Sequence, residues 1–351
     1  MFGGSVNYER LILSEESCWT GGPQEYASYL GGNVPKDQAS QKQEALARMQ
    51  QALAEKRILK PTMPYVKDVM GDEEGFGRQV EFGEIVVEEV NLRESVRDYR
   101  RELDLEKGIA RVSYSVGKTL FSRQLCSYPD AVCILRMQSS APRSINIRVS
   151  LSTPHTTTAE YSNIHNRLGF KSHLDSNNLA IEAQVAVKTE GATGISLATS
   201  PQQIVLMGFD TVTLYYTFGT GWSANAFPEF ANMDPHERLT GVLDKAVTGW
   251  YGDLVNKHLS DYGGLFSRFR LEFGVDQDDK GTSVGKNILT TDQLVVKNHR
   301  GTLPASEESY LETLLVQYSR YLLITSSRPG SLPLTGNGVW ASNDKIASTL
   351  S

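Results

Sequence analysis

Seven short strand-like segments follow one another between residues 82 and 218, and their close spacing is the feature that most constrains the fold. The segments are rich in β-branched and aromatic residues, and several alternate apolar with polar positions. Turn formers such as Gly117, Pro129 and Pro142 separate them. The intervening stretches are too short for helices, which excludes parallel βαβ units. An antiparallel sandwich is therefore predicted from the segments EIVVEEV, ARVSYSV, KTLFSRQLC, AVCILRM, SINIRVSLS, LAIEAQVAV and TVTLYYTF.

The residues before this region contain both strand-like and helical segments. Residues 2–6 and 9–13 are strand-like and flank Asn7, a residue that tolerates turns. Residues 36–59 are rich in Ala, Gln, Lys and Glu, and their apolar residues recur at helical spacing. We expect an amphipathic helix there, closed by Pro61 and Pro64.

Helical periodicity returns after Pro235. One predicted helical face ends at Trp250, and a second runs from Leu254 to Phe266 although two adjacent glycines weaken it. A short strand at 268–273 and a polar loop at 274–285 are expected next. A last helix follows, with Ser306 as its expected N-cap. The first face consists of Leu239, Val242, Leu243, Ala246, Val247 and Trp250.

The last helix, from Tyr310 to Thr325, carries more apolar surface than a solitary helix can leave in water. The residues after Trp340 are polar and show neither a helical nor a strand period. The chain is therefore expected to stop before its helical domain is complete, and self-association through the exposed helix from Tyr310 to Thr325 is predicted.

Composition excludes several classes of protein. The chain of 351 residues has 41 acidic and 35 basic residues, for a net charge of −6, which argues against nucleic acid as a partner. No stretch approaches the roughly 20 apolar residues of a membrane span, so no membrane association is expected. The first residues show no signal-peptide pattern, and the compartment is left unassigned.

Cys18, Cys126 and Cys133 are too few to form a disulfide framework. Cys126 and Cys133 lie in apolar strand-like text and are expected to be small buried hydrophobes. No C-x-x-C motif is present, which makes thiolate-bound zinc improbable.

Histidine and glycine patterns give no sign of a metal or cofactor. His155, His165 and His173 are spread through a turn-rich segment and are expected to be surface histidines. The chain has no phosphate-binding loop and no G-x-G-x-x-G before a helix, so we expect no metal and no cofactor.

Acidic and aromatic residues do not form a recognisable active site. A G-x-S-x-G motif is absent, and a glycosidase would need two carboxylates across a cleft. The candidate carboxylates are each expected to be solvated or capping charges: Glu15, Glu16, Asp98, Asp104 and Asp261.

The tryptophans are candidate platforms for sugar stacking. Trp250 fits a helical core face, so packing is expected for it. Trp19 and Trp340 lie near glycines in loops, where stacking against a sugar and packing remain open alternatives.

Five segments in order resemble the N-terminal part of glycoside hydrolase family 95, the inverting α-L-fucosidases, and a fungal member in particular. They read FGGSVNYERLILSEESCWTGGP, FGRQVEFGEI, YRRELDLEKGIARVSYSVG, HLSDYGGLFSRFRLEFG and QYSRYLLITSSRPGSLP. The resemblance implies a β super-sandwich, a helical linker and an (α/α)6 barrel that holds the active site. It also implies hydrolysis of terminal fucose from oligosaccharides or xyloglucan with inversion, in which a glutamic acid protonates the leaving oxygen and a positioned water attacks.

The resemblance implies three parts in this chain. Residues 1–230 correspond to the β-sandwich, residues 231–305 to the linker, and residues 306–351 to the start of a truncated barrel. The fold class is thus β-rich and multidomain (α+β), with the first helix of an incomplete (α/α)6 barrel.

The same resemblance assigns no catalytic residue to this chain, because the family's asparagines and carboxylates lie beyond the matching part. The family pattern P-x-N-L-Q-G-x-W reads PLTGNGVW over residues 333–340, which departs from it at three positions. Arg328 and Trp340 match near the barrel mouth and Trp19 matches the W-x-G-G-P loop, so these three are candidate substrate-binding residues that are mainly expected to pack.

Three functional hypotheses follow. The first is a truncated α-L-fucosidase relative that is inactive as this chain alone. The second is a non-catalytic module that binds a fucosylated glycan or another partner through the sandwich. The third is an incomplete gene model of an active fucosidase. Complete relatives of the family are often secreted, and no signal peptide is seen here.

Overall fold

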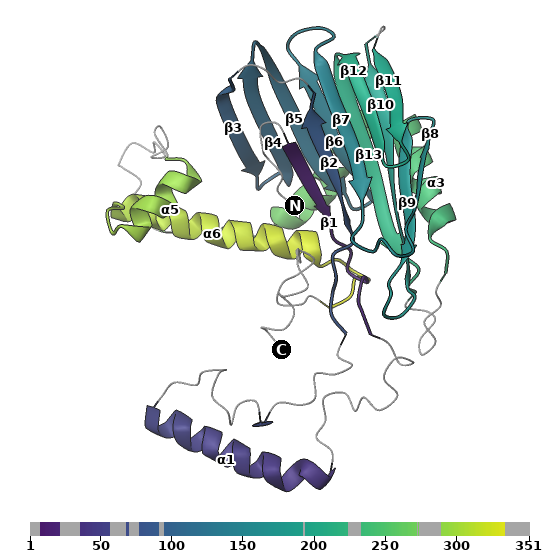
Figure 1. Cartoon of the computed structure of the whole chain (residues 1–351). Coiled ribbons are helices and arrows are strands. Elements are labelled where there is room, and N and C mark those ends of the chain that lie inside the picture. The colour runs from purple at the N-terminus through teal and green to yellow at the C-terminus, as the bar shows by residue number, and fades with distance from the viewer. Residues whose placement is uncertain are drawn as a thin grey trace.

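A computed structural model describes residues 8–21, 36–56, 68–69, 77–90, 95–191, 194–223, 233–271, 273 and 289–333. Two antiparallel sheets lie face to face, and helices follow them in the chain (Figure 1). This architecture confirms the predicted β-sandwich followed by a helical region.

The smaller sheet has five strands in the order β1-β2-β7-β12-β11, and the larger has eight in the order β3-β4-β5-β6-β13-β10-β9-β8. The strands of the smaller sheet are β1 (Tyr8–Leu13), β2 (Gly83–Glu89), β7 (Ile145–Ser152), β12 (Gln203–Phe209) and β11 (Ile195–Ser200). Those of the larger sheet are β3 (Arg97–Asp104), β4 (Ile109–Val116), β5 (Lys118–Ser127), β6 (Val132–Ser139), β13 (Thr211–Thr220), β10 (Ala180–Glu190), β9 (Arg167–His173) and β8 (Glu160–Ile164).

The main hydrophobic core lies between the two sheets. Strand β7 shows how it forms, because every second residue from Ile145 to Leu151 is buried. Across the core, Phe82 packs against Phe170 and Phe218 with ring centroids 5.9 and 5.4 Å apart. Removal of this apolar surface from water is the main force that holds the sheets together.

All seven predicted segments form strands, namely β2, β4, β5, β6, β7, β10 and β13. Sequence reasoning missed β3, β8, β9, β11 and β12. Strand β3 reads RDYRRELD and shows no apolar period of two, and β11 is short with all six residues exposed. His165 and Asn166 both have positive φ and make the two-residue turn that joins β8 to β9.

Helices α3 (His236–Thr248) and α4 (Tyr251–Phe266) pack on the outer face of the larger sheet and form a second core with it. Leu243 and Ala246 of α3 lie against Ile134 and Tyr215 in this core. The ring of His236 also lies 2.7 Å from the buried carboxylate of Glu182 on β10. The large sheet is therefore apolar on one face and partly covered by helices on the other.

Two further helices follow, α5 (Thr291–His299) and α6 (Ala305–Ser326), and the predicted amphipathic helix is α1 (Ala39–Lys56) after a short 3-10 turn, η1 (Lys36–Gln38). A third apolar cluster joins α4 to α6 through Tyr262, Phe266 and Tyr321. The β3–β4 turn passes close to Tyr262, where Gly108 has φ +60° and a Cβ would lie 3.2 Å from the ring. Only glycine fits that turn without strain.

Several expectations for the helical region are wrong in detail. Trp250 is 69% exposed and caps the start of α4, because α3 ends two residues earlier. Ser306 lies inside α6, whose N-cap is Pro304. The described residues of 268–273 form no strand, and α5 was not anticipated. The predicted loop at 274–285, the strand at 2–6 and the two prolines after α1 lie outside the described residues.

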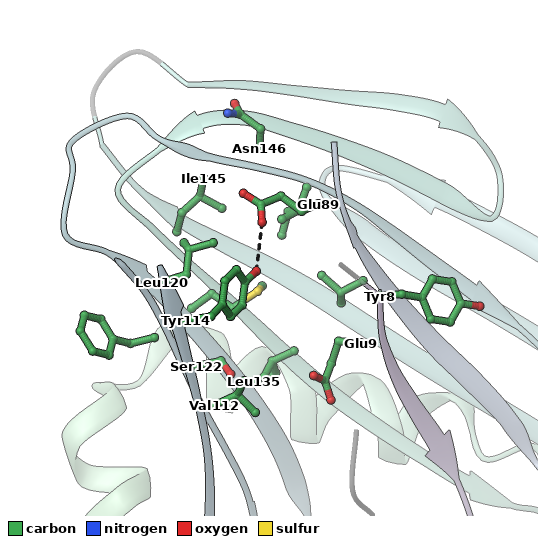
Figure 2. A pocket seen from close by; sticks show the side chains of 14 residues that line it. Tyr8, Glu9, Glu89, Val112, Tyr114, Leu120, Ser122, Leu135, Ile145 and Asn146 are labelled. Atoms are coloured by element: carbon green, nitrogen blue, oxygen red, sulfur yellow. Dashed lines mark hydrogen bonds between the residues drawn. The ribbon is translucent and has the colours of Figure 1, made fainter. Parts of the chain in front are cut away.

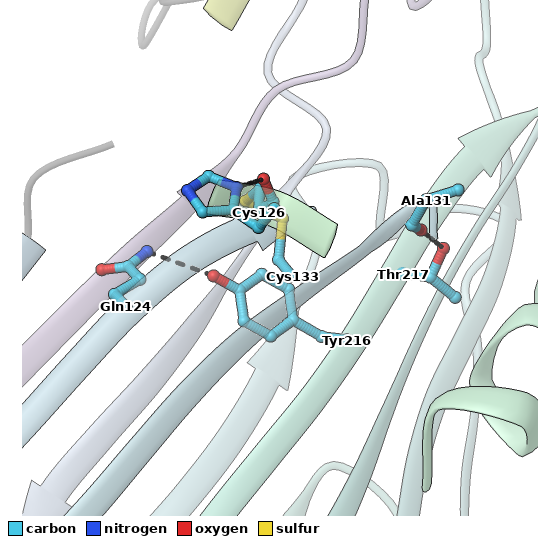
Figure 3. Close-up of a disulfide and its surroundings, with 7 residues drawn as sticks. Gln124, Cys126, Ala131, Cys133, Tyr216 and Thr217 are labelled. Carbon is cyan, nitrogen blue, oxygen red and sulfur yellow. Dashed lines mark hydrogen bonds between the residues drawn. A yellow bond between two sulfur atoms is a disulfide. The ribbon is translucent and has the colours of Figure 1, made fainter. Parts of the chain in front are cut away.

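The expectation for the cysteines is also wrong. Cys126 and Cys133 form a disulfide across the β5–β6 hairpin, and Cys18 is the free, buried thiol (Figure 3). The strand register places the two half-cystines directly opposite each other. Figure 3 shows hydrogen bonds on either side of the bridge, from Gln124 to the hydroxyl of Tyr216 and from Thr217 to the carbonyl of Ala131. Local sequence did not show this pairing, because only the register of the hairpin brings the two residues together.

We expect the Cys126→Ser variant to lose about 2 kcal/mol of unfolding free energy, because the bridge restricts the unfolded chain. Urea unfolding of the wild type and the variant, each with and without a reducing agent, measures this loss. The reductant should destabilise the wild type and leave the variant unchanged. Three titratable thiols instead of one in denatured, unreduced protein would contradict the pairing.

Candidate functional site

Trp19 lies in the loop after β1, where its polar groups form hydrogen bonds with other residues of the chain. Its indole N–H donates to the carbonyl of Glu16 at 2.7 Å, and its own carbonyl accepts from the amide of Asn177 at 2.8 Å. Its backbone also forms an isolated bridge with Gln79. The indole is half-buried and its N–H is already satisfied.

Arg328 follows α6 and contacts two other parts of the chain, α4 and the β5–β6 turn. Its guanidinium pairs with Asp261 of α4 and lies 4.7 Å above the ring of Tyr128 in the β5–β6 turn. The hydroxyl of Tyr128 donates to the carbonyl of Pro329 at 3.1 Å. Only 11% of the Arg328 side chain is exposed. Arg328 therefore holds the segment after α6 against α4 and the sandwich.

Trp19 and the segment after Arg328 meet at Glu16. The carboxylate of Glu16 accepts from the backbone N–H of Leu332 at 3.3 Å, while the carbonyl of Glu16 holds the Trp19 indole. We call the contact of Glu16 with Trp19 and Leu332, together with Arg328 shortly before Leu332 in the chain, the loop junction. It brings together residues more than 300 positions apart in sequence. The third candidate, Trp340, lies outside the described residues.

A small cavity between the sheets has two carboxylates in its lining (Figure 2). Glu9 of β1 and Glu89 of β2 both line it, with apolar residues of both sheets around them. Its volume is about 50 Å³, enough for one or two water molecules and too small for a sugar ring. The cavity is therefore not a glycosidase site, although it holds two acids.

The two acids have different surroundings. Glu89 is buried, and its carboxylate accepts from the hydroxyl of Tyr114 at 3.0 Å and pairs with Lys118 at 3.1 Å. Burial raises the pKa of Glu9 to about 7, and the charge of Arg101 opposes the shift. Burial and the charge of Glu89 together raise the pKa of Tyr114 as well. Strand alternation could have flagged Glu9, because it shares a face with the buried Leu11 and Leu13.

The other carboxylates considered from sequence hold the chain in place. Glu15 accepts from the backbone and hydroxyl of Ser17 at 2.7 and 2.6 Å, and burial raises its pKa. Asp261 pairs with Arg328. Asp98 lies exposed at a positive φ of 52°.

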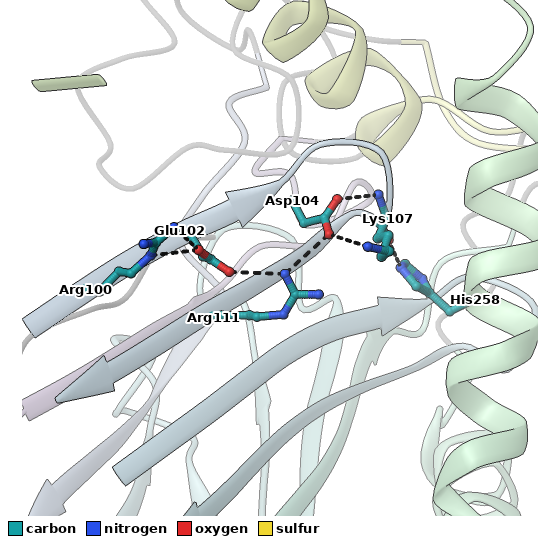
Figure 4. Close-up of polar contacts among 6 residues, drawn as sticks. All are labelled: Arg100, Glu102, Asp104, Lys107, Arg111 and His258. Atoms are coloured by element: carbon teal, nitrogen blue, oxygen red, sulfur yellow. Dashed lines mark hydrogen bonds and ion pairs between the residues drawn. The ribbon is translucent and has the colours of Figure 1, made fainter. Parts of the chain in front are cut away.

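Asp104 belongs to a polar network at the end of β3 and β4 (Figure 4). It accepts from Lys107 and Arg111, and these hydrogen bonds outweigh burial and lower its pKa. His258 of α4 lies beside the same turn, with its ring nitrogens 2.8 Å from the carbonyl of Lys107 and 3.0 Å from that of Cys126. His258 thus ties α4 to two turns of the larger sheet.

Metal-binding clusters and membrane-spanning helices do not occur in the described part of the chain. It contains no group of three or more His, Cys, Asp or Glu residues arranged to hold a metal ion. The helices described there are all too short or too polar to cross a membrane. The Nε2 atom of His155, one of the loop histidines, lies 2.8 Å from the carbonyl oxygen of Glu81.

Two family models match the chain. Residues 1–225 match the N-terminal domain of glycosyl hydrolase family 65, and residues 250–348 match the catalytic domain of glycosyl hydrolase family 95.

Three curated relatives cover almost the whole chain at low identity. Two are named probable alpha-fucosidase A, from Aspergillus niger (28% identity, 96% of this chain, 41% of the relative) and Aspergillus oryzae (28%, 98% and 46%). The third is alpha-L-fucosidase 2 of Arabidopsis thaliana, at 26% identity over 96% of this chain and 40% of the relative. The chain spans less than half the length of these relatives.

Because the folded-state pKa of Glu9 lies near 7 and its ordinary value is 4.5, the ionised form of Glu9 destabilises the fold. We expect Glu9→Gln to raise stability above pH 7, on the order of 1–2 kcal/mol after allowance for the exposed part of the side chain. The gain should fade as pH falls below 7 and vanish below 4.5, where Glu9 becomes protonated in both states.

Thermal unfolding of both proteins across this pH range measures the effect. Glu160→Gln, at an exposed position on β8, is the matched control and should change little at any pH. A pH-independent difference between the wild type and Glu9→Gln would contradict the assignment.

Proposed function

The chain belongs to the glycosyl hydrolases that pair a family 65-type N-terminal domain with a family 95 catalytic domain, and from this we propose that it is the N-terminal region of an α-L-fucosidase. The matches to both domains, in this order along one chain, carry the proposal. The relatives named alpha-fucosidase support it, because they align with nearly all of these 351 residues.

The proposed reaction of the whole enzyme is removal of terminal fucose from oligosaccharides or xyloglucan with inversion. Inversion needs a carboxylic acid and a carboxylate about 6.5–9.5 Å apart, with space for a sugar and a water between them. Among the described residues, Glu9 and Glu89 line a cavity too small for this, and Glu89 is held by Tyr114 and Lys118. We therefore propose that this chain alone is inactive and supplies the scaffold.

We propose a division of the chain into three parts, in which the sandwich ends close to the end of the family 65 match and the family 95 match begins within the linker. Residues 1–230 form the β-sandwich domain, residues 231–305 a helical linker, and residues 306–351 the start of the catalytic barrel. In this division the loop junction connects the sandwich to the first barrel segment. We propose that Trp19, Arg328 and Trp340 position that segment at the barrel mouth, with sugar contact as their second role.

A non-catalytic role in binding fucosylated glycans is the second candidate. It is supported by the sandwich, whose two sheets pair continuously from β1 to β11 and from β3 to β8. A sandwich of this kind does not need an active site to bind a sugar on its surface.

Purified chain incubated with 2′-fucosyllactose is expected to release no fucose, because the acid and base lie outside it. A longer chain that also contains the complete family 95 domain is the positive control and should release fucose. Fucose release by the 351-residue chain, unchanged after repurification, would contradict the inactivity. Heat on calorimetric titration with the same sugar, without turnover, would favour the binding module.

The outer face of α6 is proposed as a surface for self-association. Leu315 is 64% exposed and Leu323 is 51% exposed, while Tyr321 on the inner face packs on α4. We expect the double variant Leu315→Gln, Leu323→Gln to lower the mass measured by light scattering across a concentration series, since glutamine keeps the helix.

Val295→Gln, at a 52% exposed position on α5, is the control for loss of exposed apolar surface elsewhere in the chain and should associate like the wild type. A wild-type chain that stays monomeric over the whole series would rule out this surface.

A further inference from the structure

We propose that the outer face of the larger sheet binds a carboxylated glycan in a groove built on three adjacent arginines. The groove has a volume of about 450 Å³ and lies on β3, β4, β5 and β6. The proposal goes beyond the fucosidase assignment, because the groove is lined by strands of the sandwich and includes none of the residues of the loop junction.

The register of three neighbouring strands places three arginines in a row across the sheet. Arg111 of β4 pairs with Arg123 of β5, and Arg123 pairs with Arg136 of β6. We call Arg111, Arg123 and Arg136 the arginine row. Neighbouring strands lie about 4.8 Å apart, so three guanidinium groups leave the same face within about 10 Å. Like charges placed directly opposite each other destabilise a sheet, so this arrangement needs compensating anions.

The two outer arginines have such anions within the chain. Arg111 donates to Glu102 at 3.2 Å and to Asp104 at 3.3 Å (Figure 4). Arg136 donates to both carboxylate oxygens of Glu190, at 2.9 and 3.3 Å.

The central arginine differs from its neighbours. Arg123 is exposed and has no carboxylate partner among the described residues. Its side chain is therefore available to a carboxylate from outside, which a guanidinium binds through two parallel hydrogen bonds.

The next row of the sheet supplies groups that suit a sugar. Ser113, Phe121 and Gln138 lie opposite one another on β4, β5 and β6 and line the groove. Phe121 is 49% exposed, although it lies in the middle of a paired strand. A flat aromatic ring can stack on the apolar face of a sugar, while the amide and hydroxyl bind its hydroxyl groups.

The charges in and around the groove favour a short anionic ligand. The groove lining contains four arginines and one glutamate, in a chain whose net charge is −6. On one side the guanidinium carbon of Arg136 lies 4.8 Å from the centre of the Tyr251 ring. The groove therefore meets the start of α4. Glu102 and Glu190 flank the row, which limits the positive region to about the width of one or two sugar residues. A long polyanion such as nucleic acid would meet these acidic flanks.

Calorimetric titration of the wild-type chain with an α-1,4-linked trigalacturonic acid tests the proposal. We expect saturable binding that weakens with added salt. Arg123→Gln should weaken it by about tenfold or more, since a charged hydrogen-bonded pair is lost. Phe121→Ala should weaken binding without changing its salt dependence. Both positions are exposed, and circular dichroism checks that the variants fold.

Arg300→Gln removes the same charge from the exposed end of α5 and should bind like the wild type. The methyl-esterified trisaccharide, which lacks the carboxylates, should not bind. Equal binding by Arg123→Gln, equal binding of the methyl ester, or no binding by the wild type would each overturn the proposal. Tighter binding of a DNA oligonucleotide would show a general polyanion surface instead. None of these outcomes depends on whether the longer protein releases fucose.

Discussion

Burial of apolar side chains between the two sheets is the interaction on which the rest of the structure depends. Residues from both sheets, among them Phe82, Leu135, Val149 and Leu214, are almost completely removed from water there. This packing fixes which face of each strand points inward. It therefore also fixes which residues point outward, and the helices, the arginine row and the loop junction all lie on those outward faces or at the strand ends.

The larger sheet carries two different surfaces on its outer face. One row of residues, including Leu125, Ile134 and Tyr215, is apolar and is covered by α3 and α4. The next row holds the arginines, lines a groove, and includes the exposed Arg123. A single set of strands thus serves as a base for the helical region and as a charged surface, because each row across the sheet can differ from its neighbour while the inward face stays apolar.

The structure explains why some elements could be predicted and others could not. Strands β7 and β13 have apolar residues at a regular period, so their local sequence is sufficient. Strand β3 is charged along its length and forms because β4 supplies its hydrogen bonds. Local sequence was equally insufficient for the loop junction. Trp19 and Arg328 were found from motifs, but Glu16, which brings them together, was seen only as one of several loop carboxylates.

By itself, the amino-acid sequence determined the order of β and helical regions, the positions of most strands and the family to which the chain belongs. Those properties depend on residue types and short periods, which are local. The tertiary structure alone decided that Cys126 bonds to Cys133, that Trp250 is exposed and that three arginines stand side by side. Each of these depends on strand register or on where a helix begins. Register and helix ends are set by how segments pack and pair with one another, and residue types and short periods do not encode that packing.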